Sequence, residues 1–437
     1  MSNDPLATAE FFLHIKQPEK AKIVLDLLKP YASKIEDIDR LGKLYADARE
    51  FNDTLELGLK IYGMLPPDHS GVFDARTNII RAYLNLNEPI KALEYILINE
   101  QEKPKDHATQ MDKALVYYLL NEKDKGEVIL RKLLTQPRSQ DIDFRVKFNL
   151  GSYDLRKGEF KSGLRHVLID GKKLNIWETI DLDIPSWDGT PMPGKTLLIC
   201  SDAGIGDEII NVRFQKHIKD LGMNPIWHSP RKDLLEVFKR NGFSVLYNLK
   251  EVQDEWVWAY GMTMPVLLDL DYPDLWYGPY LTPKREKEQL PGKFRVGIKC
   301  KGNQKYDQDL HRSLPEQQFV DCFPKDWTLY SFHVGEDTEI DSPRVISLRD
   351  KIKTWDDTLD YIDQMDLIVS SCTSLPHAAS AMGKETIVFT PILNYYLWAY
   401  PNKHSAWYSK NTTILRQQEY DNWNAPLAEL KDILCKR

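Results

Sequence analysis

The stretch GKTLLICSDAGIGDEII, residues 194–210, decides how the second half of the chain is interpreted. It begins with a β-rich run at residues 196–200 and passes through a glycine-containing loop into a helix predicted over residues 207–221. Further β-rich runs follow at residues 225–228 and 244–247, with a second helix predicted between them. Strands that alternate with helices are typical of a parallel sheet with helices on its faces.

A second series of the same kind begins near residue 294. In open α/β sheets, ligands bind at the carboxyl ends of the strands, so we expect functional residues in the loops that follow them. Two such units, joined near residues 279–291, would face each other across a cleft. The predicted strands of the second unit are residues 294–298, 328–332, 344–348, 367–370 and 386–389.

The first third of the chain carries a recurring helical phrase that closes on a small residue. Successive copies close 33, 38, 34 and 37 residues apart, near the 34-residue period of tetratricopeptide repeats. Helix pairs of this kind stack on one another because none can bury its own apolar face. A generic helical bundle with coincidental spacing is the alternative. The closing residues are Ala21, Thr54, Ala92, Gly126 and Gly163.

The composition excludes several classes of protein. The chain has 437 residues, of which 42% are hydrophobic and 28% charged, as in folded multidomain proteins. Its net charge of −7 provides no general attraction to nucleic acid or anionic lipid. Five scattered cysteines without a C-x-x-C pair indicate neither a disulfide framework nor a zinc cluster. No signal peptide or apolar span is evident, so we expect a soluble protein of the reducing cytoplasm.

The loop after the first strand contains Gly204, Gly206 and Asp207 and leads directly into a helix. The glycines allow close approach of the backbone to a ligand, and a helix N-terminus offers unpaired N–H groups. The third glycine of a dinucleotide-binding fingerprint is replaced by Ile209. On this motif alone, the favoured role of Asp207 is that of a helix N-cap or first-turn acid.

The loop after residues 294–298 is rich in cations in an otherwise acidic protein. Lys301, Lys305 and Arg312 lie close together in sequence there, and they could hold a diphosphate. A solvated loop would also explain the lysines. It explains Gly302 and the Arg-Ser-Leu-Pro segment before the next predicted helix less well.

The loop after residues 367–370 leads through Thr373 and Ser374 into an alanine-rich helix. Hydroxyl groups and free amides at a helix N-terminus suit an anion. His377 lies in the first turns of this helix, where a lone histidine is more often packed or capping than catalytic. Three phosphate-compatible loops at equivalent ends of two α/β units are more informative than any one of them.

The order of these motifs resembles that of glycosyltransferases joined to tetratricopeptide repeats, which are relatives of the bacterial heptosyltransferases with the GT-B fold. The resemblance covers residues 194–420, and the repeats cover most of the remainder. The motifs that carry it are GKTLLICSDAGIGDEII, MTMPVLLDL, GPYL, GIKCKGNQKYDQDLHRSLPEQQF, WTLYSF, DLIVSSCTSLPHAASAMGKETIVFTP, SAWYS and LRQ.

The resemblance implies a fold of helical repeats, residues 1–172, a linker, 173–193, and a GT-B-like pair of Rossmann-type α/β domains. Residues 194–288 would form the acceptor side and residues 289–437 the nucleotide-sugar donor side. It further implies transfer of a sugar from a nucleotide-sugar to an acceptor hydroxyl, with no metal or other cofactor. The acceptor is left open among protein, glycan, lipid-linked glycan and modified nucleic acid. The repeats would recruit it, bind a partner protein or pair two subunits.

The resemblance also assigns roles to residues. Asp207 falls on the general base that takes the proton of the acceptor hydroxyl, and Arg312 on the cation that neutralises the leaving diphosphate. The remaining residues expected to bind the donor or its phosphates are Gly204, Gly206, Lys301, Asn303, Lys305, Thr373, Ser374 and His377. Residues expected to flank the base or sugar, if they are not simply core, are Cys372, Trp398, Trp407 and Tyr408.

Two positions depart from the family pattern. Cys372 replaces a customary acid, and Cys300 replaces a customary tryptophan. An acid at the first position would hold sugar hydroxyls, so its loss leaves the donor sugar open. The alternative function is a non-catalytic repeat scaffold or binding protein with a degenerate transferase domain. A hydrolase or epimerase that uses the same cleft is a third interpretation.

Overall fold

The computed structural model describes residues 4, 6–171, 180, 182–302, 309–335 and 338–437. Its internal contacts divide the chain into two units, Met1–Gln136 and Pro137–Arg437. Among the described residues, no helix is long and apolar enough to cross a membrane.

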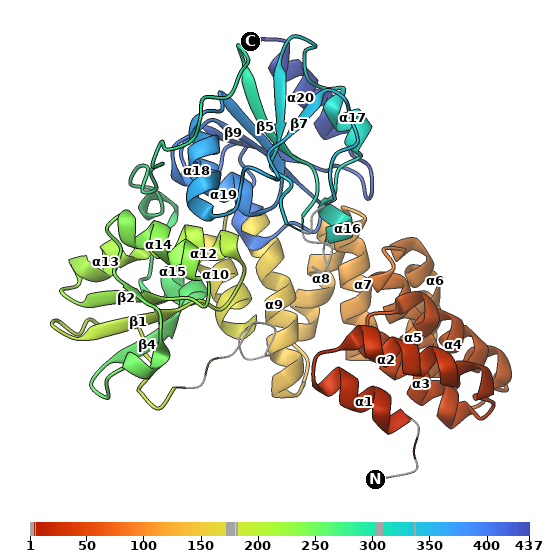
Figure 1. Ribbon diagram of the computed structural model, residues 1–437. Coiled ribbons are helices and arrows are strands. Elements are labelled where there is room, and N and C mark those ends of the chain that lie inside the picture. The colour runs from red at the N-terminus through yellow and green to blue at the C-terminus, as the bar shows by residue number, and fades with distance from the viewer. Residues whose placement is uncertain (1–3, 5, 172–179, 181, 303–308, 336–337) are drawn as a thin grey trace. The chain divides into compact units, whose positions relative to one another are not determined.

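The first unit consists of consecutive helices that pack in pairs, as Figure 1 shows. Small residues lie where the helices approach closely: Ala21 and Ala92 are completely buried, and a Cβ atom on Gly42 would lie 3.7 Å from Leu57 Cβ. The predicted helical repeats are therefore present. The helices are α1 (Leu6–His14), α2 (Pro18–Leu28), α3 (Ile35–Asp47), α4 (Phe51–Met64), α5 (Val72–Asn85), α6 (Pro89–Glu102), α7 (His107–Leu119) and α8 (Lys123–Leu134), with a 3₁₀ turn, η1 (Lys29–Tyr31), after α2.

The second unit begins with α9 (Gln140–Lys157) and α10 (Phe160–Leu164), which continues as a π-helical turn, η2 (Arg165–Asp170). A Cβ atom on Gly151 would lie 2.9 Å from the Gly163 carbonyl oxygen, so both glycines are needed where α9 and α10 cross. The repeat phrase predicted here thus forms a helix pair, and the contact division assigns that pair to the second unit. The four predicted domain ranges stay predictions. Residues 172–179 and 181, in and next to the predicted linker, lie outside the described residues.

The first sheet of this unit has the strand order β3-β2-β1-β4, and all its pairs are parallel. The predicted strands are present, and β4 is an additional strand that the sequence interpretation missed. The long predicted helix is divided by a 3₁₀ turn. The elements are β1 (Thr196–Cys200), α12 (Ile205–Asn211), η3 (Val212–Phe214), α13 (Gln215–Asp220), β2 (Asn224–His228), α14 (Lys232–Arg240), β3 (Val245–Leu246), η4 (Leu249–Glu251), β4 (Val257–Tyr260), η5 (Gly261–Thr263), α15 (Met264–Leu267) and η6 (Tyr272–Asp274).

The second sheet has the order β10-β9-β8-β5-β6-β7 and is also entirely parallel. All five predicted strands are present, and β10 was missed. The elements are β5 (Arg295–Lys299), α16 (Asp309–Arg312), α17 (Glu316–Val320), β6 (Thr328–Ser331), β7 (Val345–Ser347), α18 (Trp355–Asp363), β8 (Leu367–Ser371), α19 (Ser374–Ala381), β9 (Thr386–Thr390), η7 (Tyr396–Trp398), β10 (Thr412–Arg416) and α20 (Asn424–Leu434).

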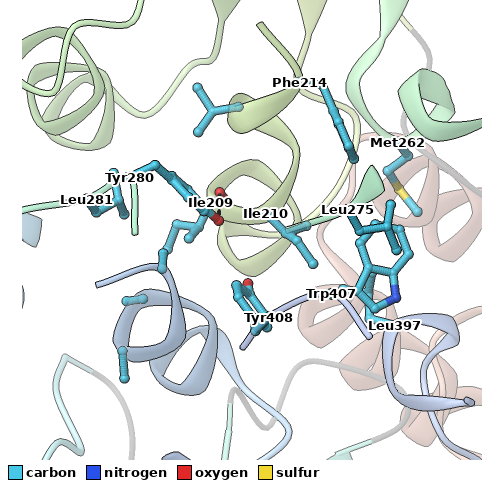
Figure 2. Close-up of a cluster of buried hydrophobic side chains, with 14 of the residues drawn as sticks. Ile209, Ile210, Phe214, Met262, Leu275, Tyr280, Leu281, Leu397, Trp407 and Tyr408 are labelled. Atoms are coloured by element: carbon cyan, nitrogen blue, oxygen red, sulfur yellow. Dashed lines mark hydrogen bonds between the residues drawn. The ribbon is translucent and has the colours of Figure 1, made fainter. Parts of the chain in front are cut away.

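The two α/β halves of this unit share one apolar core. Helix α12 of the first half packs against α19 of the second. Figure 2 shows Ile210 on the first half near Leu397, Trp407 and Tyr408 on the second. The predicted fold class, helical repeats followed by a pair of parallel α/β units, is confirmed. Because the core is continuous, loops at the ends of both sheets lie close together.

Candidate functional site

The loop after β1 holds Asp207 at the start of α12. Gly204 is the N-cap residue, and Asp207 is the third residue of the helix. The Gly204 N–H donates a 3.1 Å hydrogen bond to Asp207 Oδ2. The other carboxyl oxygen, Oδ1, is shielded from solvent and has no hydrogen-bond partner. The capping interaction therefore uses one oxygen of Asp207 and leaves the other available.

The surroundings of Asp207 favour its neutral form. Burial raises the pKa of this carboxyl group from 3.8 to about 7. The nearby carboxyl groups of Asp202 and Glu208 act in the same direction, while hydrogen bonds from Tyr395 and Gly204 lower the pKa. A carboxylate with a pKa near neutrality can take and release a proton under physiological conditions.

The next residue, Glu208, has a different environment although it lies on the same helix. It is almost completely buried, forms an ion pair with Arg231, and accepts a 3.2 Å hydrogen bond from Trp227 Nε1. Both of its oxygens are thus used within the protein. Glu208 therefore stabilises the first α/β half, whereas Asp207 retains a free oxygen.

The loop after β5 holds Arg312 in a fixed position. Arg312 Nε donates a 2.8 Å hydrogen bond to Asp309 Oδ1, which also accepts from the Gly302 N–H. A Cβ atom on residue 302 would lie 2.0 Å from Arg312 Nη2, so only glycine fits beside this guanidinium. Lys301 forms an ion pair with Glu316. Asn303 and Lys305, predicted to bind the donor, lie outside the described residues.

The loop after β8 contains Cys372, Thr373 and Ser374. Thr373 is the N-cap of α19, but its hydroxyl group lies 3.2 Å from Ser370 Oγ and makes no capping bond. Ser374 is the first residue of α19 and is partly exposed. The first N–H groups of α19 therefore lack a side-chain cap, and the binding of an anion there stays a prediction.

Several of the predicted site residues meet around Cys372. Its carbonyl oxygen accepts a 2.7 Å hydrogen bond from Arg312 Nη1, and its sulfur accepts one of 3.0 Å from Trp398 Nε1. Burial raises the pKa of the Cys372 thiol to about 11, and the charges of Arg312 and Asp207 also influence it. The tertiary structure thus brings Arg312 and Trp398 together at Cys372, at the end of α19 that packs against the Asp207 helix α12.

His377 lies behind this cluster in the packing between α12 and α19. Its ring stacks on Trp398 at 4.8 Å, and Nδ1 lies 3.0 Å from the Tyr408 hydroxyl group. A Cβ atom on Gly206 would lie 2.7 Å from the ring, so Gly206 permits this contact. Burial, together with the charge of Arg213, lowers the pKa of His377 to about 3. The imidazole is therefore neutral at physiological pH.

Sequence reasoning missed Asn211, Tyr395, Tyr396 and Arg213. Asn211 lies four residues after Asp207, and this helical spacing could have indicated it.

Arg213 is completely buried; its Nη1 donates hydrogen bonds to the carbonyl oxygens of Leu275 and Trp407. The expected ligand Trp407 is itself 1% exposed and lies in the shared core. No periodic signal marks the two tyrosines, because they lie at the start of a single short 3₁₀ turn, η7, after β9.

Comparison of the whole chain with known proteins gives no match to a family model and none to a curated protein. Among the described residues, no group of three His, Cys, Asp or Glu side chains could hold a metal ion. The absence of a bound metal from the reaction stays a prediction.

Solved structures are similar to the helical repeats, to the α/β half of the chain or to the whole chain. A thermophilic tetratricopeptide-repeat protein of Thermus thermophilus is 20% identical over 39% of this chain and 91% of its own, with a TM-score of 0.31. The E. coli heptosyltransferase WaaC, solved with ADP, is 10% identical over 55% of this chain and 99% of its own, with a TM-score of 0.38. An O-GlcNAc transferase of Thermobaculum terrenum is 10% identical over 100% of this chain and 94% of its own, with a TM-score of 0.36. Tetratricopeptide-repeat proteins and heptosyltransferases, the two kinds that the sequence motifs resemble, are thus both among the structures to which this chain is similar.

Proposed function

We propose that the chain is a glycosyltransferase that moves a sugar from a nucleotide-sugar donor to an acceptor hydroxyl group. The observation that carries the proposal is the packing of α12, which holds Asp207, against α19, which begins just after Cys372, the residue that accepts a hydrogen bond from Arg312, because a general base and a diphosphate ligand are the two groups that this transfer needs. The resemblance of the sequence motifs supports the same reaction.

Asp207 acts as the general base in this proposal. Its unpartnered Oδ1 accepts the proton of the acceptor hydroxyl group as the oxygen attacks the anomeric carbon. The bond from that carbon to the diphosphate oxygen breaks in the same displacement, and the electron pair leaves with the nucleoside diphosphate. A single displacement of this kind inverts the configuration of the anomeric carbon.

Arg312 stabilises the charge that develops on the leaving diphosphate. Its bonds to Asp309 and to the Cys372 carbonyl fix the guanidinium before the donor binds, so little side-chain entropy is lost on binding. The uncapped end of α19 supports the same anion through Thr373, Ser374 and the N–H groups that follow.

The helical repeats present or recruit the acceptor in this proposal, since stacked helix pairs offer an extended surface for a partner. A scaffold that only binds a nucleotide-sugar would keep the Arg312 site but would not need an ionisable Asp207. Substitution of Asp207 therefore separates transfer from binding alone.

The experiment begins with ligand-observed NMR of UDP-, GDP-, ADP- and CMP-sugars against the full chain and an Arg312→Ala variant. We expect one nucleotide to bind the wild type selectively and to be lost in the variant. Release of nucleoside diphosphate is then measured for the wild type and Asp207→Asn. Equal release by both proteins would contradict the proposed transfer.

A further inference from the structure

The helix pair α9–α10 packs against both α/β halves of the second unit. The centre of the Phe160 ring lies 4.2 Å from that of Tyr272 in the first half and 5.8 Å from that of Trp407 in the second. The Tyr272 ring in turn lies 4.0 Å from the Tyr400 ring of the second half. The last helix pair of the repeat pattern is therefore packed where the two halves meet.

Arg156, near the end of α9, reaches the segment between β9 and β10, residues 391–411. Its Nη2 donates a hydrogen bond to the carbonyl oxygen of Ile392. Gly158, the C-cap residue of α9, lies beside the same segment, since a Cβ atom there would be 3.4 Å from the Tyr400 ring. The helix pair thus contacts the β9–β10 segment at two places.

Hydrogen bonds within and around the β9–β10 segment converge on Trp398. The Ile392 carbonyl also accepts a 2.9 Å hydrogen bond from the Asn394 N–H, and Asn394 Nδ2 donates one of 3.4 Å to the Trp398 carbonyl. Arg416 of β10 donates to the carbonyl oxygens of Trp398 and Tyr400. Because these bonds cross-link the segment, the position of Ile392 and that of the buried Trp398 indole depend on each other.

The Trp398 indole contacts the residue that holds Arg312. Its Nε1 donates a 3.0 Å hydrogen bond to Cys372 Sγ, and the Cys372 carbonyl accepts one of 2.7 Å from Arg312 Nη1. That carbonyl and Asp309 are the two groups described above that fix the guanidinium. A continuous series of hydrogen-bonded residues therefore runs from Arg156 on α9 to the proposed diphosphate ligand.

We infer that Arg156 is a positioning residue for the proposed transfer, because it holds Cys372, and hence Arg312, in place through the β9–β10 segment. This inference rests on the proposed function. The sequence pattern groups α9 with the repeats that would recruit the acceptor, whereas these contacts connect α9 to the donor site. Without Arg156 the segment gains freedom, and donor binding must supply the cost of ordering it.

A positioning role and a purely stabilising role of Arg156 differ in a measurable way. If Arg156 only stabilised the fold, its loss would lower the free energy of unfolding and leave the nucleotide affinity of the folded protein unchanged. A positioning residue changes the affinity of the folded protein as well. The conservative variant Arg156→Lys, whose ammonium group can still donate to the Ile392 carbonyl, should then restore most of the affinity.

The test is calorimetric titration of the full chain with the nucleoside diphosphate that binds best, after urea unfolding has shown each variant to be folded. We expect Arg156→Met to weaken the affinity about three- to tenfold, as loss of one hydrogen bond implies. Arg145→Met is the matched control on the same helix, since Arg145 forms an exposed ion pair with Asp141. It should leave the affinity unchanged.

A double-mutant cycle with Cys372→Ala tests the route of the effect. This substitution removes the sulfur that accepts from Trp398 and keeps the carbonyl that accepts from Arg312. If Arg156 acts through Cys372, Arg156→Met should weaken the affinity little further in the Cys372→Ala background. Additive losses, or an unchanged affinity in Arg156→Met alone, would overturn the inference.

Tyr400→Leu takes the place of Arg156→Met in this cycle if the latter does not fold, because it removes the ring that lies beside Gly158 and Tyr272. The same non-additive loss is expected. A wild type that binds no nucleotide contradicts the proposed function, whereas equal nucleotide binding by the wild type and the variant contradicts the positioning role alone.

Discussion

The carboxyl edges of the two sheets are built by the same local pattern and carry opposite charge. In the first half, the strand β1 leads into a loop and helix with Asp202, Asp207 and Glu208. In the second half, β5 leads into a segment with Lys301 and Arg312. Burial, together with the other acids of the first edge, raises the pKa of Asp207, whereas Lys301 and Arg312 of the second edge each have an acidic partner, Glu316 or Asp309.

The same strand–loop–helix architecture therefore supports two chemical roles, anion binding and proton transfer. A cation that binds an anion benefits from being held in place, and paired acids hold it without removing its charge. A base must instead be able to lose and regain a proton, so it is placed where its charged form is disfavoured. Substitutions on each edge should therefore affect anion binding and proton transfer separately.

The largest effect is expected within the acidic edge, between Asp207 and its neighbour Glu208. Asp207→Asn should reduce turnover about a hundred- to ten-thousandfold, as loss of a general base does, while nucleotide binding is retained. It should not lower stability, and above pH 7 it should raise it, because the wild-type carboxyl group must ionise in a closed environment. Nucleoside diphosphate release and urea unfolding provide the measurements.

Glu208→Gln is the matched substitution of the adjacent acid. It breaks the buried pair with Arg231 and should lower the free energy of unfolding by on the order of 3 kcal/mol. The catalytic rate of the protein that remains folded should change far less than in Asp207→Asn. If the two variants lost turnover equally, the distinction between the two acids would be wrong.

The next effect is expected within the basic edge. Arg312→Lys keeps a positive charge but removes the planar fork, so nucleotide affinity should fall about ten- to hundredfold. Lys301→Met removes a cation that is already engaged by Glu316 and should change affinity by less than about threefold. Titration of the preferred nucleotide by calorimetry compares them, and an equal loss in both variants would mean that charge alone matters.

The contact between the two halves is tested at the glycines of the first loop. Gly206→Ala places a Cβ atom 2.7 Å from the His377 ring, which Trp398 and Tyr408 hold in place, and should cost about 1–3 kcal/mol of stability. Gly204→Ala is the control, because its Cβ atom would lie 3.4 Å from Asp207 Oδ2 at an ordinary φ of −73°. Chemical denaturation that ranks the two variants equally would show that the halves adjust freely.

The smallest effect is a shift in pH dependence. A base with a pKa of about 7 is active only when ionised, so turnover should rise with pH through about 7 and level off above it. Asp202→Asn keeps the acceptor for the Met262 N–H but removes a like charge, and it should move the rising limb to lower pH. A limb that stays in place would mean that Asp202 does not influence the base.

Much of the fold could be predicted from the sequence because it depends on local patterns. The strands of both sheets follow from short apolar runs between turn residues, and the repeats from the spacing of small residues. Strands β4 and β10 were missed although both are rich in the aromatic or β-branched residues that favour strands. The loops that carry Asp207, Arg312 and Cys372 were found because each follows a predicted strand.

Local sequence patterns are sufficient to predict the helical repeats, the two parallel α/β halves and the loops in which Asp207, Arg312 and Cys372 lie. The tertiary structure alone decided that Arg312 bonds the Cys372 carbonyl, that Glu208 is paired with Arg231, and that Asp207 keeps an oxygen without a hydrogen-bond partner. The physical reason is that strand and helix patterns arise from neighbours in the chain, whereas pairing, burial and the resulting pKa depend on contacts between residues that are far apart in sequence.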